Sequence, residues 1–567
     1  MNVISDMDMF TLDPITVEVI RRRLVAIADG VDLNVSRTAF SPYIYEYKDY
    51  AVAIVDAEGA LICQCTGGIP IFVADVMSAA VRDGLEIYAD EGIERGDVII
   101  TNYSGTLGQH LNNVAMYTPI FSETTIIGFM VVVMHWVDVG GKQIGSISLD
   151  ATEIFQEGIQ FRSVKLHRRG IRVEDIYRII QYNTRLPTSV MGDIESQVGG
   201  CLMGRDEVEG LIARYGVSIY RRAIQAIWTN SETAVRKAIA AIPDGEYRAE
   251  TFLDNDGLTS DEPLRLAVRV IIAGDEFTLD LSGVAPQAIS PINSGVSGGG
   301  QTVARLGFRY LLVPDGDVNE GTFRPLRLVL PPGTLVSADD KAPMGSYNVP
   351  LPSLVDLIIK ALTAVLPDRT AAGHFGTFST LSITGKKDKS SALFQCHDSG
   401  FGGWGALSDA DGPGPFRTMC HGDTRLIPIE VQEATYPLII EEFGLRQDSG
   451  GAGKHRGGLG LKRVYKALGP CTARTRFDRT KFPPWGLNGG HSGAPGSVEV
   501  HASTGGKTDG LRGNLMLKEG DRLVVCTGGG GGFGDPAQRD RGAVRNDVER
   551  GYVSEEAARD VYGFTRS

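Results

Sequence analysis

The 567-residue chain lacks the long hydrophobic run that a membrane-spanning helix requires. Its longest apolar stretch, Ile126–Trp136, is interrupted by Gly128 and His135, whereas a spanning helix needs about 20 apolar residues. Basic clusters are also absent, and 56 Lys and Arg residues against 69 Asp and Glu residues leave a net charge of −13. Nucleic acids are bound largely through neutralised phosphates. We therefore expect neither a membrane nor a nucleic acid as a partner.

Cysteine is scarce. The seven cysteines are an odd number and are scattered between Cys63 and Cys526, unlike the spacing of a disulfide framework. Proteins of reducing compartments rarely contain structural disulfides. We therefore predict a soluble, cytoplasmic protein with free thiols.

Several common catalytic signatures are missing as well. The sequence contains no GxSxG nucleophile elbow and no HExxH zinc helix. The glycine-rich segment Gly450–Gly458 has a lysine but not the GxxxxGK[ST] pattern, and Gly528–Gly532 is followed by neither a lysine nor a clear helix. We interpret both segments as tight turns in closely packed backbone, rather than as phosphate-binding loops.

Glycine itself is abundant, at 71 of 567 residues, which is roughly 12% against about 7% in average proteins. A helix is predicted to begin at Pro14, because Asp13 is a good N-cap and proline is favoured at the first helical position. Strand-like runs then follow at residues 50–56, 97–103, 114–121 and 126–135. Residues 171–240 are predicted to be mainly helical, with breaks at Pro187 and at Gly199-Gly200.

The remaining sequence alternates again between strand-like and helical patterns. Strands are predicted over residues 247–336, a helix over 354–365, strands with glycine turns beyond 427, and a final helix capped by Ser554. This order favours an α+β fold with mixed or antiparallel sheets, packed helices and a glycine-rich β C-terminal part. We predict three closely packed parts: an α+β part at 1–205, a central α+β part at 206–426, and a mainly β part at 427–567.

The segment between Gly105 and Gly141 carries the clearest chemical signal. Its two strand-like runs flank a short polar segment around residue 123, which predicts a hairpin. Opposed residues in a hairpin have a constant index sum, here about 246, and His110 and His135 come close to it with 245. The two histidines are therefore expected to face each other, with Cβ atoms roughly 5–8 Å apart.

Each of these histidines has an oxygen donor three residues later: Asn113 follows His110, and Asp138 follows His135. Two imidazoles with carboxylate or amide oxygens suit a divalent ion such as Zn, Mn or Fe. The same residues could instead act as acid–base groups, or be hydrogen-bonded structural histidines at the ends of a hairpin.

Two other patterns are interpreted as structural. The pairs Cys396-His397 and Cys420-His421 lack metal-binding CxxC spacing, so we expect buried thiols beside ordinary histidines. The polar residues Glu153, Gln156 and Glu157 are expected on a solvated face.

Motifs along nearly the whole chain follow the order of one known family. They are YKDYAVAIVDAEGALICQ, GDVIITNYSGTLGQHLNNVAMYTPIF, MHWVDVGG, EIFQEGI, DLSGVAPQAISPIN, EEFGLRQDSGGAGKHRGGLG, FPPWGLNGG, and GGGGGFGDP with the closing VSEEAARDVYG. In this order they resemble the hydantoinase B/oxoprolinase family. The resemblance implies the B-type subunit of an ATP-dependent hydrolase of cyclic amides such as hydantoin, N-methylhydantoin or 5-oxoproline. A hydantoinase A-type partner would bind ATP and phosphorylate the substrate, making a hetero-oligomer.

The resemblance also implies a divalent metal at the positions of Asp49, His110, Asn113 and His135. Asp138 or a metal-bound hydroxide would take the proton from the attacking water, and we predict Asp138 and His135 as the catalytic residues. Asn113 departs from the family pattern, in which a carboxylate is usual, so the site carries one negative charge less. Two alternatives stay open: the subunit of an ATP-dependent ketone carboxylase of the acetone or acetophenone type, and a non-catalytic assembly partner.

Overall fold

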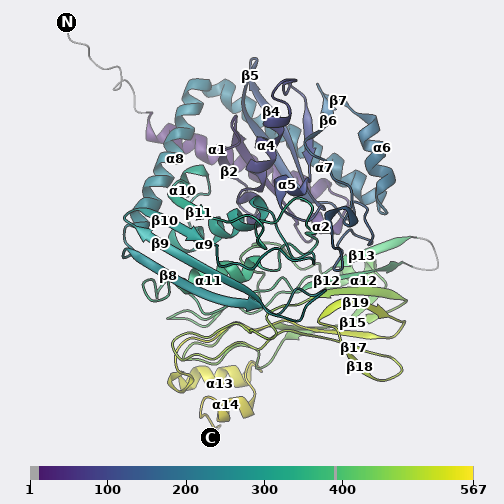
Figure 1. The fold of residues 1–567 in the computed structure, drawn as a ribbon, viewed down its shortest axis with the longest axis vertical. Coiled ribbons are helices and arrows are strands. Elements are labelled where there is room, and N and C mark those ends of the chain that lie inside the picture. The colour runs from purple at the N-terminus through teal and green to yellow at the C-terminus, as the bar shows by residue number, and fades with distance from the viewer. Residues whose placement is uncertain (1–11, 388–391, 566–567) are drawn as a thin grey trace.

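The computed structural model describes residues 12–387 and 392–565, which form four β-sheets, with most of the helices packed around the N-terminal and central sheets (Figure 1). Within these residues every strand pair is antiparallel except β10 (Glu276–Asp280) with β11 (Leu326–Val329), which is parallel. The predicted α+β class with mixed, mostly antiparallel sheets is confirmed.

A seven-stranded sheet lies between helices near the N-terminal end of the fold. Its order is β2-β1-β5-β4-β3-β6-β7. The strands are β1 (Tyr50–Asp56), β2 (Leu61–Gln64), β3 (Val98–Thr101), β4 (Asn113–Ser122), β5 (Thr125–His135), β6 (Val164–Arg168) and β7 (Ile171–Arg172). The helices of this region are α1 (Pro14–Thr38), α2 (Pro42–Tyr45), α3 (Pro70–Val73), α4 (Val76–Ile87), α5 (Ser104–Leu107), α6 (Glu174–Asn183), α7 (Pro187–Tyr215) and α8 (Val217–Ile239).

Helices α7 and α4 cover opposite faces of this sheet. A Cβ on Gly204 of α7 would meet Met130, and one on Gly84 of α4 would meet Tyr117. Met130 pairs with Thr118, the neighbour of Tyr117, and successive side chains of a strand point to opposite faces. The sheet is therefore buried on both sides, which explains the near-continuous apolar sequence of β4 and β5.

The predicted helix break at Gly199-Gly200 is wrong, because α7 continues through both glycines. A Cβ on Gly200 would lie 2.7 Å from Val35 of α1. Glycine is needed there because the two helices approach closely, and its helix-weakening effect of about 1 kcal/mol relative to alanine is offset by packing.

The rest of the chain forms the other three sheets. The central sheet contains β8 (Gly245–Leu253), β9 (Leu264–Ala273), β10 and β11, with helices α9 (Thr302–Leu312), α10 (Glu320–Phe323) and α11 (Leu351–Ala361). The next has the order β13-β12-β16-β19, and the last β14-β15-β20-β17-β18. Their elements are β12 (Thr380–Lys386), β13 (Leu393–His397), α12 (Ile429–Thr435), β14 (Leu438–Leu445), β15 (Leu461–Ala467), β16 (Cys471–Arg476), β17 (Ser497–His501), β18 (Lys507–Asp509), β19 (Arg512–Leu517), β20 (Arg522–Cys526), α13 (Arg541–Glu549) and α14 (Glu555–Asp560).

Two elements cross the boundaries predicted between the three parts. Helix α7 runs through the boundary at 205/206, and one hydrophobic core joins residues from Val17 to Leu362. The sheet of β12, β13, β16 and β19 joins strands on both sides of 426/427. The parts 1–205, 206–426 and 427–567 therefore share elements and core, because burial here depends on strands and helices that are distant in sequence.

The glycine-rich segments pack against each other, backbone to backbone. Gly451 donates its N–H to the Gly530 oxygen at 2.8 Å, and Gly530 donates to Gly458 at 2.9 Å. None of the glycines in Gly528–Gly532 has a positive φ. The interpretation as closely packed backbone is therefore confirmed, but the reason for glycine here is close approach rather than turn geometry.

All seven cysteines are free thiols, as expected. None of the helices in residues 12–387 and 392–565 combines the length and the apolar character needed to span a bilayer.

Candidate active site

Four histidines from distant parts of the sequence line one small buried cavity. His110 lies just before β4, His135 ends β5, His397 ends β13, and His421 lies in a turn of the 417–425 segment. The free volume of the cavity, about 20 Å³, suits a single water molecule or ion. The other lining residues are Asp49, Ile71, Phe72, Asn113, Ile147, Gly345, Tyr347, Asn348, Phe378 and Thr380.

The predicted β-hairpin brings two of these histidines together. Strands β4 and β5 pair along their whole length, which confirms the hairpin. Asn113, rather than His110, stands opposite His135. The turn pairs Ser122 with Thr125, an index sum of 247 rather than 246, and the irregularity between Ile120 and Phe121 raises the sum to 248, so His110 falls before the strand. The His110 and His135 rings nevertheless lie close, with centroids 5.0 Å apart.

Asp49 reaches the cavity because it directly precedes β1, the strand on the other side of β5. Its backbone oxygen accepts a hydrogen bond from the His135 N–H at 3.0 Å, and its own N–H donates to Tyr43 at 2.9 Å. The Tyr43 ring in turn stacks on the His135 ring, with centroids 5.1 Å apart. The structure therefore places Asp49, His110, Asn113 and His135, the four predicted metal ligands, around one cavity.

Burial keeps the four imidazoles neutral. Loss of hydration lowers the pKa of His110 to about 4 and that of His397 to about 3, and it holds the pKa values of His135 and His421 well below the usual range. The nearby Arg417 lowers the pKa of His397 and of His421 further. A neutral imidazole keeps a lone pair on one ring nitrogen, which is the form that binds metals.

Burial acts on Asp49 in the opposite direction. Desolvation raises the pKa of its carboxyl group to about 7, and the positive charge of Arg417 opposes that rise. A cation beside Asp49 would favour its charged form, as an opposite charge does for any buried carboxylate.

Several buried atoms of the cavity have no hydrogen-bond partner in the described part of the chain. His135 Nδ1 and His397 Nδ1 are such atoms. His110 Nε2 lies 3.0 Å from Asn113 Oδ1, while the Asn113 amide group donates to Gln109 at 2.8 Å. His110 also hydrogen-bonds the backbone of Gly345.

The unpartnered nitrogen of His135, the neutral imidazole of His110, the Asn113 amide oxygen and the Asp49 carboxylate make a donor set that a divalent cation would satisfy. Nitrogen and oxygen donors of this kind suit Zn, Mn or Fe. The residues present therefore fit the metal that the resemblance implies.

The structure does not place Asp138 in this cavity. Its side chain is fully buried, and its carboxylate accepts hydrogen bonds from the Gly145 N–H at 2.8 Å, the Arg185 N–H at 2.6 Å and the Thr184 hydroxyl at 3.0 Å. These bonds tie the 138–146 loop to the start of α7. The arrangement supports a positioning role and gives no support to proton transfer at the histidine cavity.

This arrangement predicts the effect of Asp138→Asn. The variant should lose about 1–3 kcal/mol of unfolding free energy, because the amide cannot accept all of these hydrogen bonds as the carboxylate does. Urea unfolding measures the change, with the exposed Asp90→Asn as the control of equal charge change. A variant as stable as the wild type but without activity in the complex would contradict the positioning role.

The sequence interpretation missed two of the cavity histidines. Cys396 and Cys420 are buried, as expected, but His397 and His421 line the cavity. The only signal in the sequence was the recurrence of the Cys-His pair.

Glu157 was expected on a solvated face, and this is wrong: its side chain is buried. Its carboxylate accepts hydrogen bonds from the Met344 N–H at 2.8 Å and the Gly345 N–H at 2.7 Å, and burial raises its pKa to about 8. The helical pattern misled because residues Ile154–Gln156 form only a short 3₁₀ turn. Glu157 therefore supports the backbone of Gly345, which contacts His110.

Comparison with known proteins agrees with the sequence motifs. The family model described as hydantoinase B/oxoprolinase matches residues 13–536. The chain belongs to the hydantoinase B/oxoprolinase family. The resemblance in the sequence motifs is thereby confirmed.

Two relatives of this hydantoinase B-type chain match over almost their full length. An uncharacterised protein of Methanocaldococcus jannaschii is 34% identical, with 96% of this chain and 95% of the relative covered. The caprolactamase subunit beta of Pseudomonas jessenii is 30% identical, with 98% and 96% covered.

Solved structures show the same fold. A chain of the ATP-dependent caprolactamase crystal structure from Pseudomonas jessenii superposes with a TM-score of 0.91 at 28% identity, covering 98% of this chain and 97% of that one. A chain of nucleotide-free acetone carboxylase matches with a TM-score of 0.89 at 22% identity, covering 98% and 80%. At that identity, the second likeness concerns the fold alone.

Proposed function

We propose that this chain is the B-type subunit of an ATP-dependent cyclic-amide hydrolase, and that it carries the site where a phosphorylated substrate is attacked by water. The observation that carries the proposal is the buried cavity of neutral histidines with Asp49 and Asn113, in a chain of the hydantoinase B/oxoprolinase family. The substrate class is a ring such as hydantoin, N-methylhydantoin or 5-oxoproline. The caprolactamase relative, named for another cyclic amide, supports this class.

Asp49, His110, Asn113 and His135 would hold a divalent ion in this cavity. When bound, such an ion polarises a carbonyl group and lowers the pKa of water. The chain itself supplies the enclosure: Tyr43 stacks on His135, and the Tyr347 ring packs edge-on against His110 with centroids 5.0 Å apart. These contacts hold the imidazoles in place and exclude bulk water.

Activation of the substrate is assigned to an A-type partner subunit. An amide is a poor electrophile, and phosphorylation of its oxygen makes the carbon open to attack. The glycine-rich segments of this chain use their N–H groups within the backbone packing, as Gly451 and Gly530 do. Those N–H groups are therefore not free to cradle a phosphate, which supports a division of labour between two subunits.

The decisive experiment is reconstitution with the cognate A-type subunit. We expect the mixture to hydrolyse ATP and open at least one of the three rings, detected by chromatography of the ring-opened product. This chain alone should show no ATPase activity, and robust ATP hydrolysis by the purified chain would contradict the division of labour.

The same assay separates the alternative reactions. The second candidate is a ketone carboxylase, because the family resemblance of the sequence motifs extends to acetone- and acetophenone-carboxylase subunits. ATP-dependent uptake of labelled bicarbonate into acetone or acetophenone, without ring opening, would select it. Absence of both reactions from a correctly assembled complex would favour a non-catalytic assembly role.

A further inference from the structure

A second and larger cavity, of about 700 Å³, adjoins the wall of the histidine cavity. The two cavities share the segment around residues 417–425: His421 lines the histidine cavity, whereas Gly422 and Asp423 line the larger one. The same holds at α3, where Pro70 faces the larger cavity and Ile71 the smaller. The larger cavity is therefore separate from the histidine site.

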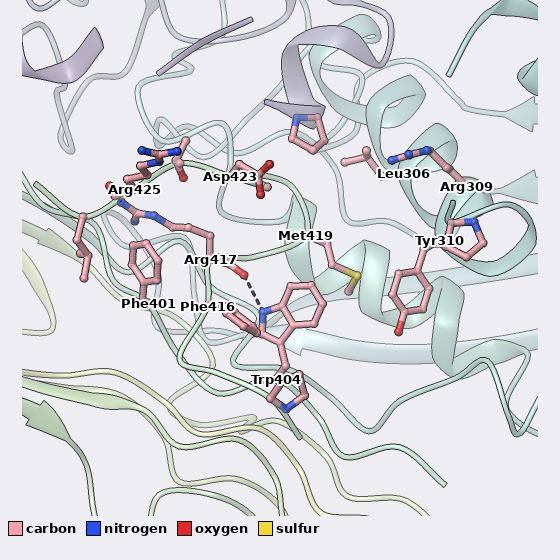
Figure 2. A pocket seen from close by; sticks show the side chains of 16 residues that line it. Leu306, Arg309, Tyr310, Phe401, Trp404, Phe416, Arg417, Met419, Asp423 and Arg425 are labelled. Atoms are coloured by element: carbon pink, nitrogen blue, oxygen red, sulfur yellow. Dashed lines mark hydrogen bonds between the residues drawn. The ribbon is translucent and has the colours of Figure 1, made fainter. Parts of the chain in front are cut away.

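Apolar side chains make up much of this second cavity. Figure 2 shows Trp404, Phe416 and Met419 in its middle, with Tyr310 on one side and Phe401 on the other. The Trp404 indole N–H donates to the Arg417 carbonyl at 2.7 Å, which fixes the ring in the wall. Phe416 is 50% exposed, although it lies among other aromatic side chains. A volume of this size is typical of small-ligand sites, which are commonly about 300–1,000 Å³.

Two arginines stand together at the Phe401 end. Figure 2 shows Arg417 and Arg425 side by side there, and Arg417 donates from Nη2 to the Arg425 backbone oxygen at 3.4 Å. Arg417 is only 2% exposed, and its Nε–H has no partner in residues 12–387 and 392–565. Within the described residues its side chain donates hydrogen bonds only to backbone oxygens, those of Ser399, Gly400 and Arg425.

Neither arginine forms an ion pair with a carboxylate of the described residues. This is unusual in a chain whose acidic residues outnumber its basic ones by 13. Arg417 packs over the Tyr47 and Phe401 rings, at 4.5 and 4.3 Å from their centroids, but aromatic faces do not neutralise its charge. The Asp49 carboxyl acts on Arg417 electrostatically but forms no direct ion pair with it. A buried guanidinium without a direct ion pair is costly, and a bound anion would supply one.

We propose that this cavity binds a small organic carboxylate with an aromatic or branched aliphatic body. The carboxylate pairs with Arg417 and Arg425, whose planar donor groups match its two oxygens. The body lies against Phe401, Phe416 and Trp404. This inference is independent of the proposed ring-opening reaction, because the binding needs neither ATP nor a partner subunit.

Isothermal titration calorimetry of the purified full chain tests the proposal. The probe is 3-phenylpropionate, with 3-phenylpropionamide as its neutral analogue and propionate as the anion without an aromatic body. We expect saturable binding of one 3-phenylpropionate per chain. Each of the two analogues should bind at least about tenfold more weakly, since each loses either the charge-assisted hydrogen bonds or the apolar contact.

Two variants separate the contributions of charge and body. Arg425 is exposed, so Arg425→Gln should fold normally. It should weaken the binding of 3-phenylpropionate about tenfold and leave the affinity for 3-phenylpropionamide unchanged. Phe416→Ala should weaken the binding of 3-phenylpropionate and of 3-phenylpropionamide by the same factor. The matched control is Arg178→Gln on α6, which removes the same charge from an exposed position and should change nothing.

Three results would overturn the proposal: no saturable binding of 3-phenylpropionate, equal affinity for the acid and its amide, or wild-type affinity in Arg425→Gln. Each of these three results can occur while the reconstituted complex still opens cyclic amides. Conversely, the chain can bind 3-phenylpropionate even if the complex is inactive. The outcome is therefore distinct from that of the proposed function.

Discussion

Replacing His135 by alanine is expected to lower the turnover of the reconstituted complex by roughly 10²–10³-fold or more. Removing a single group that stabilises charge in an active site typically lowers kcat by this factor. His135 lies in the cavity with an unpartnered Nδ1 and stacks on Tyr43. Among residues 12–387 and 392–565 no hydrogen bond depends on its Nδ1, so the variant should remain folded. His110→Ala is expected to have the same effect on turnover.

Elemental analysis of the purified chain provides a readout besides activity. We expect the wild type to retain close to one equivalent of Mn, Zn or Fe, and His135→Ala to lose it. The matched control is His501→Ala. The imidazole of His501 is partly exposed, hydrogen-bonds Glu499 and is not among the residues that line the cavity. Near-normal turnover and unchanged metal content in His135→Ala would return His135 to a structural role.

The second large effect is expected for Gly530→Ala in the glycine-rich packing. A Cβ at Gly530 would lie 1.9 Å from the Trp404 carbonyl oxygen and 2.7 Å from the Gly405 nitrogen. Both are backbone atoms of a neighbouring segment, so no side chain can rotate to make room. We expect a loss of about 3 kcal/mol or more in unfolding free energy, the upper range for overpacking.

Urea or thermal unfolding measures this loss, and Gly444→Ala in β14 is the matched control. A Cβ at Gly444 meets no atom within 4 Å, so we expect a change within about 0.5 kcal/mol. Equal midpoints for Gly530→Ala and the wild type would show that the packed segments can separate at little cost.

Elements that depend on local interactions were predicted well. The helix beginning at Pro14 is capped by Asp13, whose carboxylate accepts from Ile15 and Thr16, and the last helix is capped by Ser554. Strand β1 spans the predicted residues 50–56. Caps and alternating patterns act over a few residues, and the sequence displays those residues directly.

Elements that depend on distant partners were predicted less well. The register of the hairpin differs from the predicted one because the turn pairs Ser122 with Thr125, and an irregularity between Ile120 and Phe121 shifts the pairs of residues 113–120 by one more residue. Gly199-Gly200 did not end α7, because the packing partner that makes glycine suitable is Val35 on another helix. Glu157 is buried because Met344 and Gly345, almost 190 residues later, fold over it.

The candidate site divides in the same way. Its first half, His110, Asn113 and His135, could be inferred from one hairpin, and Asp49 followed from the family motif. His397 and His421 could not, because they reach the cavity from β13 and the 417–425 segment, more than 250 residues from the hairpin. Their neighbouring residues look like ordinary buried sequence.

The amino-acid sequence alone therefore determined the family, the α+β class, the free thiols and the hairpin with its histidines, because motifs, composition and short-range periodicity can be recognised without coordinates. Folding in three dimensions decided which residues meet. It joined four histidines in one cavity and directed Asp138 away from them, and among the described residues it left Arg417 without an ion pair beside the larger cavity. These outcomes depend on the burial and desolvation of residues distant in sequence, and such contacts form only when the sheets and helices pack together.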